Sequence, residues 1–147
     1  MTEDKKIIVD TNILIYLSND VPKGTVKAVK KIKELRSGKF KLFTSEQVIR
    51  KFIVTQSNLQ KIQGEINFPK LLSDIQYIFK NFIILYPTQI SLSKLISYLS
   101  TYQITGKRIH DANIIAAVSA NNISSIFTNN FSDFSFALNE GLEIITL

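Results

Sequence analysis

The chain of 147 residues contains no cysteine and no tryptophan, and its single histidine is His110. Without cysteine it can form neither a disulfide nor a thiolate site, and one histidine cannot supply a multi-histidine metal centre. The five glycines are scattered along the chain, which excludes a P-loop and a Gly-x-Gly-x-x-Gly nucleotide turn. Any metal site must therefore be built from oxygen ligands, and nucleotide-cofactor functions have little support.

Long apolar runs are also missing. The longest candidates, residues 13–17 and 82–86, fall far short of the roughly 20 residues that cross a bilayer. The opening Met-Thr-Glu-Asp-Lys-Lys does not resemble a secretion signal, so we expect a cytoplasmic protein without membrane association. The 18 basic residues exceed the 12 acidic ones and give a formal charge of +6. This balance favours a polyanionic partner such as nucleic acid.

The chain alternates between strand patterns and helix patterns. Short β-branched or aromatic runs predict strands at residues 6–10, 41–43, 82–86, 125–128 and 143–146. Apolar residues at helical spacing predict helices at 25–36, 45 to 59, 69–80, 91–102 and 110–120, with a short one at 133–138. The polar stretch 60–67 is expected to be the least ordered part. We predict one α/β domain over residues 1–147, with a central, mostly parallel sheet of about 4–5 strands flanked by helices.

Oxygen-bearing side chains stand at the ends of predicted strands and, for Asp111, at a helix start that could face the same crevice, the place where open α/β sheets hold their ligands. In chain order they are Asp10, Thr11, Asn12, Asp111, Asn130 and Asp133. Oxygen ligands gathered in one crevice suit Mg²⁺ or Mn²⁺, which can polarise a phosphodiester and activate a water. Each residue also has a simpler interpretation: Asp111 as an acid at a helix start, Asn12 as a helix cap, and Asn130 and Asp133 as turn residues.

Four segments resemble motifs of the PIN-domain family, the nuclease fold of many VapC-type toxins from toxin–antitoxin modules. They are IIVDTNILIYL at residues 7–17, TSEQVIRKF at 44–52, KRIHDANIIAA at 107–117 and IFTNNFSDF at 126–134. The resemblance covers essentially the whole chain. It implies a ribonuclease that uses Mg²⁺ or Mn²⁺ to hydrolyse tRNA or another single-stranded or structured RNA. It also implies a homodimer and a cognate antitoxin that inhibits the nuclease.

The resemblance assigns roles by position. It makes Asp10, Asp111 and Asp133 catalytic acids and metal ligands, and Asn130 a further ligand at a position where the family has Asp or Asn. The supporting residues are Thr11, Asn12 and Thr128, and the candidate RNA contacts are Lys107, Arg108 and Lys51.

The chain departs from the family pattern at Lys51, because the family has a glutamate immediately before the aromatic residue that is Phe52 here. That glutamate helps to hold the metal or to orient its water, whereas a lysine ammonium repels the cation and pairs with the remaining carboxylates. Glu46 is five residues earlier, about 140° further round a helix, and cannot take the same place. Alternatively, Lys51 itself contacts the RNA phosphate or fills the electrostatic role of the metal.

Three hypotheses follow. The first is a metal-dependent endoribonuclease of VapC type. The second is a PIN-like domain in which Lys51 has weakened or abolished catalysis, and which binds RNA or another protein. The third is an unrelated α/β binding domain without a metal. Metal-dependent cleavage separates the first hypothesis from the others, and metal-independent RNA binding separates the second from the third.

Overall fold

The computed structural model describes residues 4–147. Residues 1–3 lie outside the described residues. They are the first residues of the predicted domain and of the segment that does not resemble a secretion signal. The strands are β1 (Lys5–Val9), β2 (Phe40–Ser45), β3 (Ile83–Leu85), β4 (Ser125–Phe127) and β5 (Glu143–Ile145). The helices are α1 (Thr11–Ser18), α2 (Gly24–Ser37), α3 (Glu46–Ile62), α4 (Phe68–Asn81), α5 (Gln89–Tyr102), α6 (Arg108–Ala120), α7 (Phe131–Phe134) and the 3-10 helix η1 (Ser135–Glu140).

The five strands form one sheet in the order β3-β2-β1-β4-β5, and all four pairings are parallel. The predicted α/β class and the predicted parallel sheet are confirmed. Strand β1 lies in the centre, where Ile8 is level with Phe43 of β2 and with Ile126 of β4. A strand paired on both sides and covered on both faces needs a continuous apolar run, which the Ile-Ile-Val sequence of β1 supplies.

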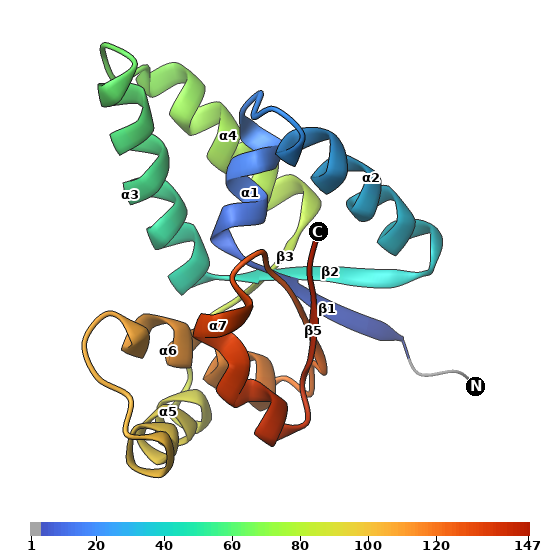
Figure 1. Cartoon of the computed structure of the whole chain (residues 1–147), viewed down its shortest axis with the longest axis vertical. Coiled ribbons are helices and arrows are strands. Elements are labelled where there is room, and N and C mark those ends of the chain that lie inside the picture. The colour runs from blue at the N-terminus through green and yellow to red at the C-terminus, as the bar shows by residue number, and fades with distance from the viewer. Residues whose placement is uncertain (1–3) are drawn as a thin grey trace.

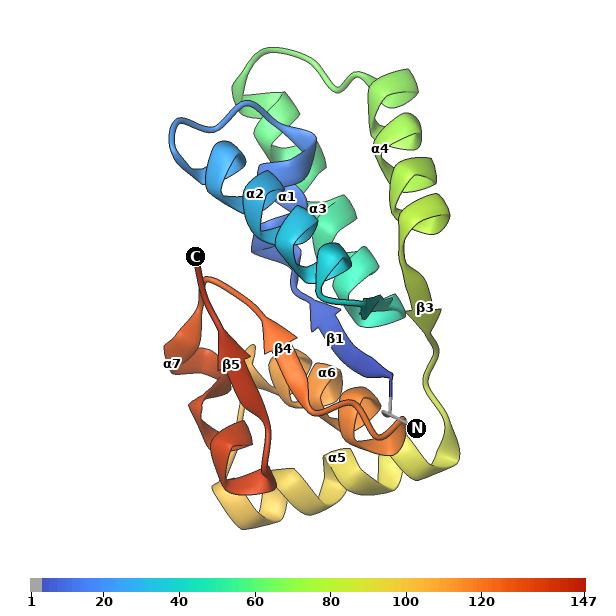
Figure 2. The ribbon, with the colours of Figure 1, turned by 90° about the vertical axis from the view of Figure 1, so that its right-hand side faces the viewer.

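Helices cover both faces of this sheet (Figure 1). Figure 2 shows α1, α2 and α3 on one face and α5 and α6 on the other, with α4 beside β3 at one edge. The core between the layers is rich in fully buried Ile and Phe side chains, among them Ile13, Phe52, Ile114 and Phe127. None of the helices in residues 4–147 has the length and apolarity required to cross a bilayer.

The connection order creates a switch point beside β1. The chain moves from β1 to β2 and β3 on one side, and then crosses to β4 and β5 on the other side. In open α/β sheets the ligand crevice lies at the carboxyl ends of the strands where this reversal occurs. Here β1 is followed by Asp10 and β4 by Thr128. The topology therefore places the ligand crevice at the same edge of the sheet where the sequence predicts a site.

The polar segment 60–67 contains the end of α3 and the turn that leads to α4. Helix α3 continues to Ile62, and the buried Gln60 side chain accepts a hydrogen bond from the Asn67 backbone N–H at 2.9 Å. Asn67 in turn caps α4, because its side chain accepts the Lys70 N–H at 3.0 Å. Side-chain bonds to the backbone therefore hold the turn between α3 and α4, which has few apolar residues.

Candidate functional site

Asp10 joins the central strand to the first helix. Its backbone is extended, and its carboxylate accepts the Thr11 N–H at 2.7 Å, so it serves as the N-cap of α1. The residue is only 2% exposed. The capping bond satisfies one orphan donor of the helix and holds the carboxylate at the end of β1.

Thr128 is the hub that links Asp10 to the fourth strand. Its hydroxyl donates to Asp10 Oδ2 at 2.7 Å, and it accepts from Asn12 Nδ2 at 3.4 Å and from the Asn130 N–H at 3.0 Å. The side-chain oxygen Oδ1 of Asn12 accepts the Asn129 N–H at 3.1 Å. Thr128 is fully buried, so its bond to Asp10 is shielded from water and fixes the position of the carboxylate.

Burial raises the pKa of the Asp10 carboxyl above its ordinary value. The Lys51 ammonium, the Thr128 hydroxyl and the Thr11 N–H each act against this rise, while the charge of Asp111 adds to it. Asp10 therefore feels the charges of two residues from other helices, Lys51 on α3 and Asp111 on α6. Asp10, Lys51 and Asp111 therefore form one electrostatic cluster. We call this cluster, together with Thr128 and Asn12, the carboxyl-edge site.

Lys51 and Asp111 form an ion pair that connects α3 to α6. The ammonium Nζ lies 2.9 Å from Asp111 Oδ1, and the two side chains are 33% and 8% exposed. The pairing that the sequence predicts for Lys51 is thus confirmed. Glu46, which was not expected to replace the missing glutamate, binds Arg50 on its own helix instead.

Asn130 and Asp133 lie further out. The Asn130 side-chain amide donates to Asp133 Oδ2, and Asp133 lies in the first turn of the short helix α7. Within residues 4–147, the hydrogen bonds connect Asp133 to Asn130 and leave it one step removed from Thr128. The structure thus gathers Asp10, Thr11, Asn12, Thr128, Lys51 and Asp111, and it leaves Asp133 at the periphery.

The candidate RNA-contact residues Lys107 and Arg108 are exposed at the start of α6. They stand four and three residues before Asp111, the spacing that places helical residues on one face. A contact that the sequence reasoning missed lies nearby: Asn113 Nδ2 donates to Gln47 Oε1 at 3.3 Å and further ties α6 to α3. Both residues fall within the motif segments, which is the signal that could have identified them.

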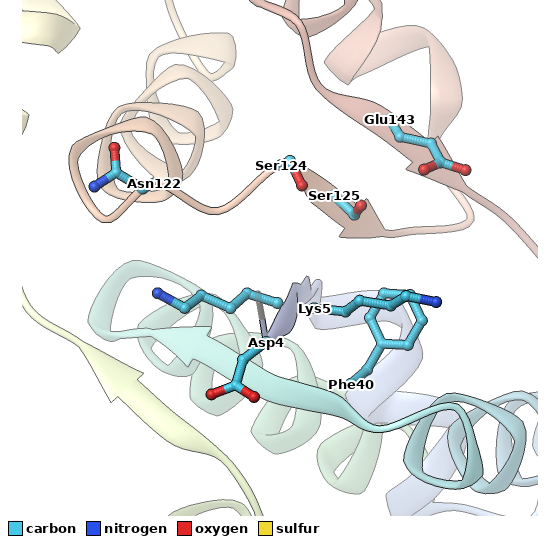
Figure 3. Close-up of a pocket in the computed structure, with 8 residues that line it drawn as sticks. Asp4, Lys5, Phe40, Asn122, Ser124, Ser125 and Glu143 are labelled. Atoms are coloured by element: carbon cyan, nitrogen blue, oxygen red, sulfur yellow. The ribbon is translucent and has the colours of Figure 1, made fainter. Parts of the chain in front are cut away.

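A hollow of about 770 Å³ lies at the opposite edge of the sheet. Figure 3 shows its lining, with Lys5 beside Phe40 on one side and Ser124, Ser125 and Glu143 on the other. These residues stand at the amino ends of β1, β2, β4 and β5, so the hollow is separated from Asp10 by the length of the strands. The residues at the carboxyl edge, and not the size of this hollow, define the candidate site.

The residues present do not fit a resident Mg²⁺ or Mn²⁺ ion. In residues 4–147, no three His, Asp or Glu side chains come close enough to share a metal ion. Asp111 already carries the Lys51 ammonium, and the charge of Lys51 also acts on Asp10. A divalent cation placed between these carboxylates would meet the positive charge of Lys51, so the arrangement favours a built-in cation over a bound one.

Comparison with known proteins gives the class of this fold. No family model matches the chain, and no curated protein sequence matches it. Solved structures match the chain. One is a chain of VapBC2 from Rickettsia felis, bound to a promoter DNA fragment, with a TM-score of 0.71 and 16% sequence identity. The match covers 97% of this chain and 98% of that chain. VapBC-1 from nontypeable Haemophilus influenzae has a TM-score of 0.67 at 19% identity, and the match covers 96% of this chain and 97% of that chain.

A third structure is a toxin with a stated target. VapC20 of Mycobacterium tuberculosis, described as cleaving the sarcin–ricin loop, has a TM-score of 0.62 at 18% identity, and 86% of this chain and 92% of that chain are covered. At these identities the likeness establishes the fold. The chain therefore has the PIN-like α/β fold of VapC-type toxins, as the sequence motifs indicate.

Proposed function

We propose that this chain binds RNA at the carboxyl-edge site and that metal-dependent cleavage there is weakened or lost. The observation that carries the proposal is the Lys51–Asp111 ion pair, which puts an ammonium among the carboxylates of a nuclease-type fold. The net charge of +6 and the exposed Lys107 and Arg108 beside the site support a polyanionic ligand. The ligand is tRNA or another single-stranded or structured RNA.

The second candidate is a metal-dependent endoribonuclease of VapC type that uses Mg²⁺ or Mn²⁺. Asp10 favours it, because this carboxylate is held at the carboxyl end of the central strand by two hydrogen bonds. In this function Asp10, Asp111, Asn130 and Asp133 would share the metal. Lys51 would first have to leave Asp111.

A protein partner is also part of the proposal. The names of the similar structures include VapBC complexes and a toxin–antitoxin complex, which supports a cognate antitoxin for this chain. Figure 2 shows α4, the edge strand β3 and the beginning of α5 along one side of the molecule. Large apolar side chains are exposed on α4, on and just after β3, and on α5, namely Leu72, Phe79, Ile83, Tyr86 and Ile90. Exposed apolar side chains of this kind suit contact with an antitoxin or with a second copy in a homodimer.

Binding and cleavage of one labelled pool of tRNA and single-stranded RNA test the two candidates together. Each sample contains Mg²⁺, Mn²⁺ or EDTA, and the natural protein is compared with Asp10→Asn and Lys51→Glu. We expect the natural protein to bind RNA with little or no cleavage, and Lys51→Glu to gain cleavage that requires metal. Fast, metal-dependent cleavage by the natural protein that disappears in Asp10→Asn would establish the second candidate. Folded protein that binds no RNA would contradict both.

A further inference from the structure

Lys51 is held at the site by its helix. It lies near the start of α3, whose N-cap Ser45 accepts the Val48 N–H at 3.2 Å, and its neighbour Phe52 is fully buried. These anchors fix the direction in which the Lys51 side chain leaves the helix. The side chain is 33% exposed, so the ammonium reaches Asp111 and solvent at once.

The ammonium has donors to spare. A lysine carries three N–H donors, and in the described part of the chain one of them is used, on Asp111 Oδ1. Two donors therefore remain for a ligand that approaches from solvent. The charge of Lys51 also acts on Asp10, where it lowers the carboxyl pKa against the effect of burial. The ammonium thus serves two carboxylates in the way a bound cation would.

The Lys51 ammonium and a divalent metal ion compete for the same position beside the Asp111 carboxylate. Mg²⁺ binds carboxylate oxygens at about 2.0–2.1 Å. The Lys51 ammonium is already 2.9 Å from one oxygen of the Asp111 carboxylate, Oδ1. Two cations on one oxygen repel each other strongly where water is largely excluded, so binding of one disfavours the other.

The surroundings suit a phosphate group. Lys107 and Arg108 lie one turn before Asp111 at the start of α6, and both are exposed. They stand four and three residues before Asp111, the spacing that places helical residues on one face. An RNA backbone approaching Lys51 therefore meets two more cations along the same helix end.

We infer that Lys51 is the phosphate-binding residue of the carboxyl-edge site, and that it supplies the positive charge there without a divalent metal. This inference rests on the proposed RNA-binding function and deepens it. The ligand chemistry is a phosphodiester oxygen that accepts hydrogen bonds from the free N–H donors of Lys51. Asp111 orients the ammonium and acts as a positioning residue.

The RNA test uses the full chain and a labelled single-stranded RNA, with affinity measured in EDTA and in Mg²⁺ over a series of salt concentrations. The variants are Lys51→Ala, Lys51→Arg and, as a matched control, Lys61→Ala, which removes an exposed lysine of the same helix. We expect the natural protein to bind equally with EDTA and Mg²⁺. Lys51→Ala should bind about tenfold or more weakly, and its salt slope should fall by about 0.7. Lys51→Arg should retain most of the affinity, and Lys61→Ala nearly all of it.

A titration without RNA tests the same inference independently. Mn²⁺ is titrated calorimetrically into the natural protein and into Lys51→Glu, after circular dichroism has shown that both are folded. We expect heat of binding for Lys51→Glu and none for the natural protein. Inorganic phosphate as a competitor separates recognition of a single phosphate from recognition of the polymer, and displacement of the RNA by phosphate supports the inference.

The outcomes separate the two proposals. RNA binding that needs Mg²⁺, or that falls equally in Lys51→Ala and Lys61→Ala, overturns the inference and leaves the RNA-binding function standing. Equal Mn²⁺ binding by the natural protein and Lys51→Glu also overturns it. Folded natural protein that binds no RNA in any condition removes the proposed function itself.

Discussion

The carboxyl and amino edges of the parallel sheet differ in the burial of their charged side chains. At the carboxyl edge Asp10 and Asp111 are buried, and each has a specific partner, Thr128 and Lys51 respectively. At the amino edge Asp4 and Lys41 also form an ion pair, at 2.6 Å, but both side chains are more than half exposed. The amino edge contains the hollow of about 770 Å³.

This difference shows that a large hollow and a functional site need not coincide. Exposed charges around a hollow cost little to place, because water solvates them. A buried carboxylate is expensive unless it is paired or hydrogen-bonded, and a chain retains one mainly where the fold or the function requires it. The burial of two acids at the switch point of the sheet is therefore the stronger indicator of a site.

The largest effect should come from the hub of the carboxyl edge. Thr128→Val keeps the shape of the side chain but removes the hydroxyl that contacts Asp10, Asn12 and the Asn130 N–H. Leaving the buried Asp10 oxygen and the two partly buried N–H groups without this partner should lower the free energy of unfolding by about 2–3 kcal/mol. Urea unfolding followed by circular dichroism measures the loss.

Thr146→Val is the matched control, because it makes the same chemical change at an exposed residue just after β5. Its unfolding midpoint should stay close to that of the natural protein. Equal losses in the two variants would show that the hydroxyl of Thr128 has no special role.

The next effect compares the ion pairs of the two edges. Lys51→Ala leaves the largely buried Asp111 without its partner, and the free energy of unfolding should fall by about 1–2 kcal/mol, less than for a fully buried pair because Lys51 is partly exposed. Lys41→Ala breaks the exposed pair with Asp4 and should lower the urea midpoint only slightly. A larger loss of unfolding free energy in Lys41→Ala than in Lys51→Ala would show that the exposed ion pair contributes more to stability than the buried one.

Much of this arrangement is predictable from the sequence. The Ile-Ile-Val-Asp run places Asp10 at the end of a buried strand, and the replacement of glutamate by Lys51 predicts a pairing with a remaining carboxylate. The structure confirms both, with Asp111 as the partner of Lys51. These predictions succeed because a strand end and a charge pair are determined by local pattern and by the order of motifs.

Other features depend on packing that no local pattern contains. Asp133 belongs to the same motif as Asn130, and in the short helix α7 its carboxylate accepts a hydrogen bond from the Asn130 side chain. The bond between Gln60 and the Asn67 backbone, which orders the turn after α3, joins residues seven positions apart and has no periodic signature. The hollow at the amino edge arises from strand ends that are distant in sequence.

The smallest effect is a difference in pH dependence between the two edges. Burial raises the folded-state pKa of Asp10, so the native state binds its proton more tightly than the unfolded chain does. The associated stability is fully present below the ordinary value of 3.8 and is lost as the pH rises through the raised pKa. The stability of Asp10→Asn relative to the natural protein should therefore increase from acidic to neutral pH.

Asp4 should show the opposite sign. The hydrogen bond and the charge of Lys41 lower its pKa, so its contribution is present above the ordinary value and is lost as the pH falls through the lowered pKa. Because Asp4 is exposed, added salt should remove this dependence, whereas the buried Asp10 should keep its own. Urea unfolding of Asp10→Asn and Asp4→Asn across this pH range, at low and high salt, measures both slopes. Slopes of the same sign, or an Asp10 slope abolished by salt, would show that the two edges do not differ in burial of charge.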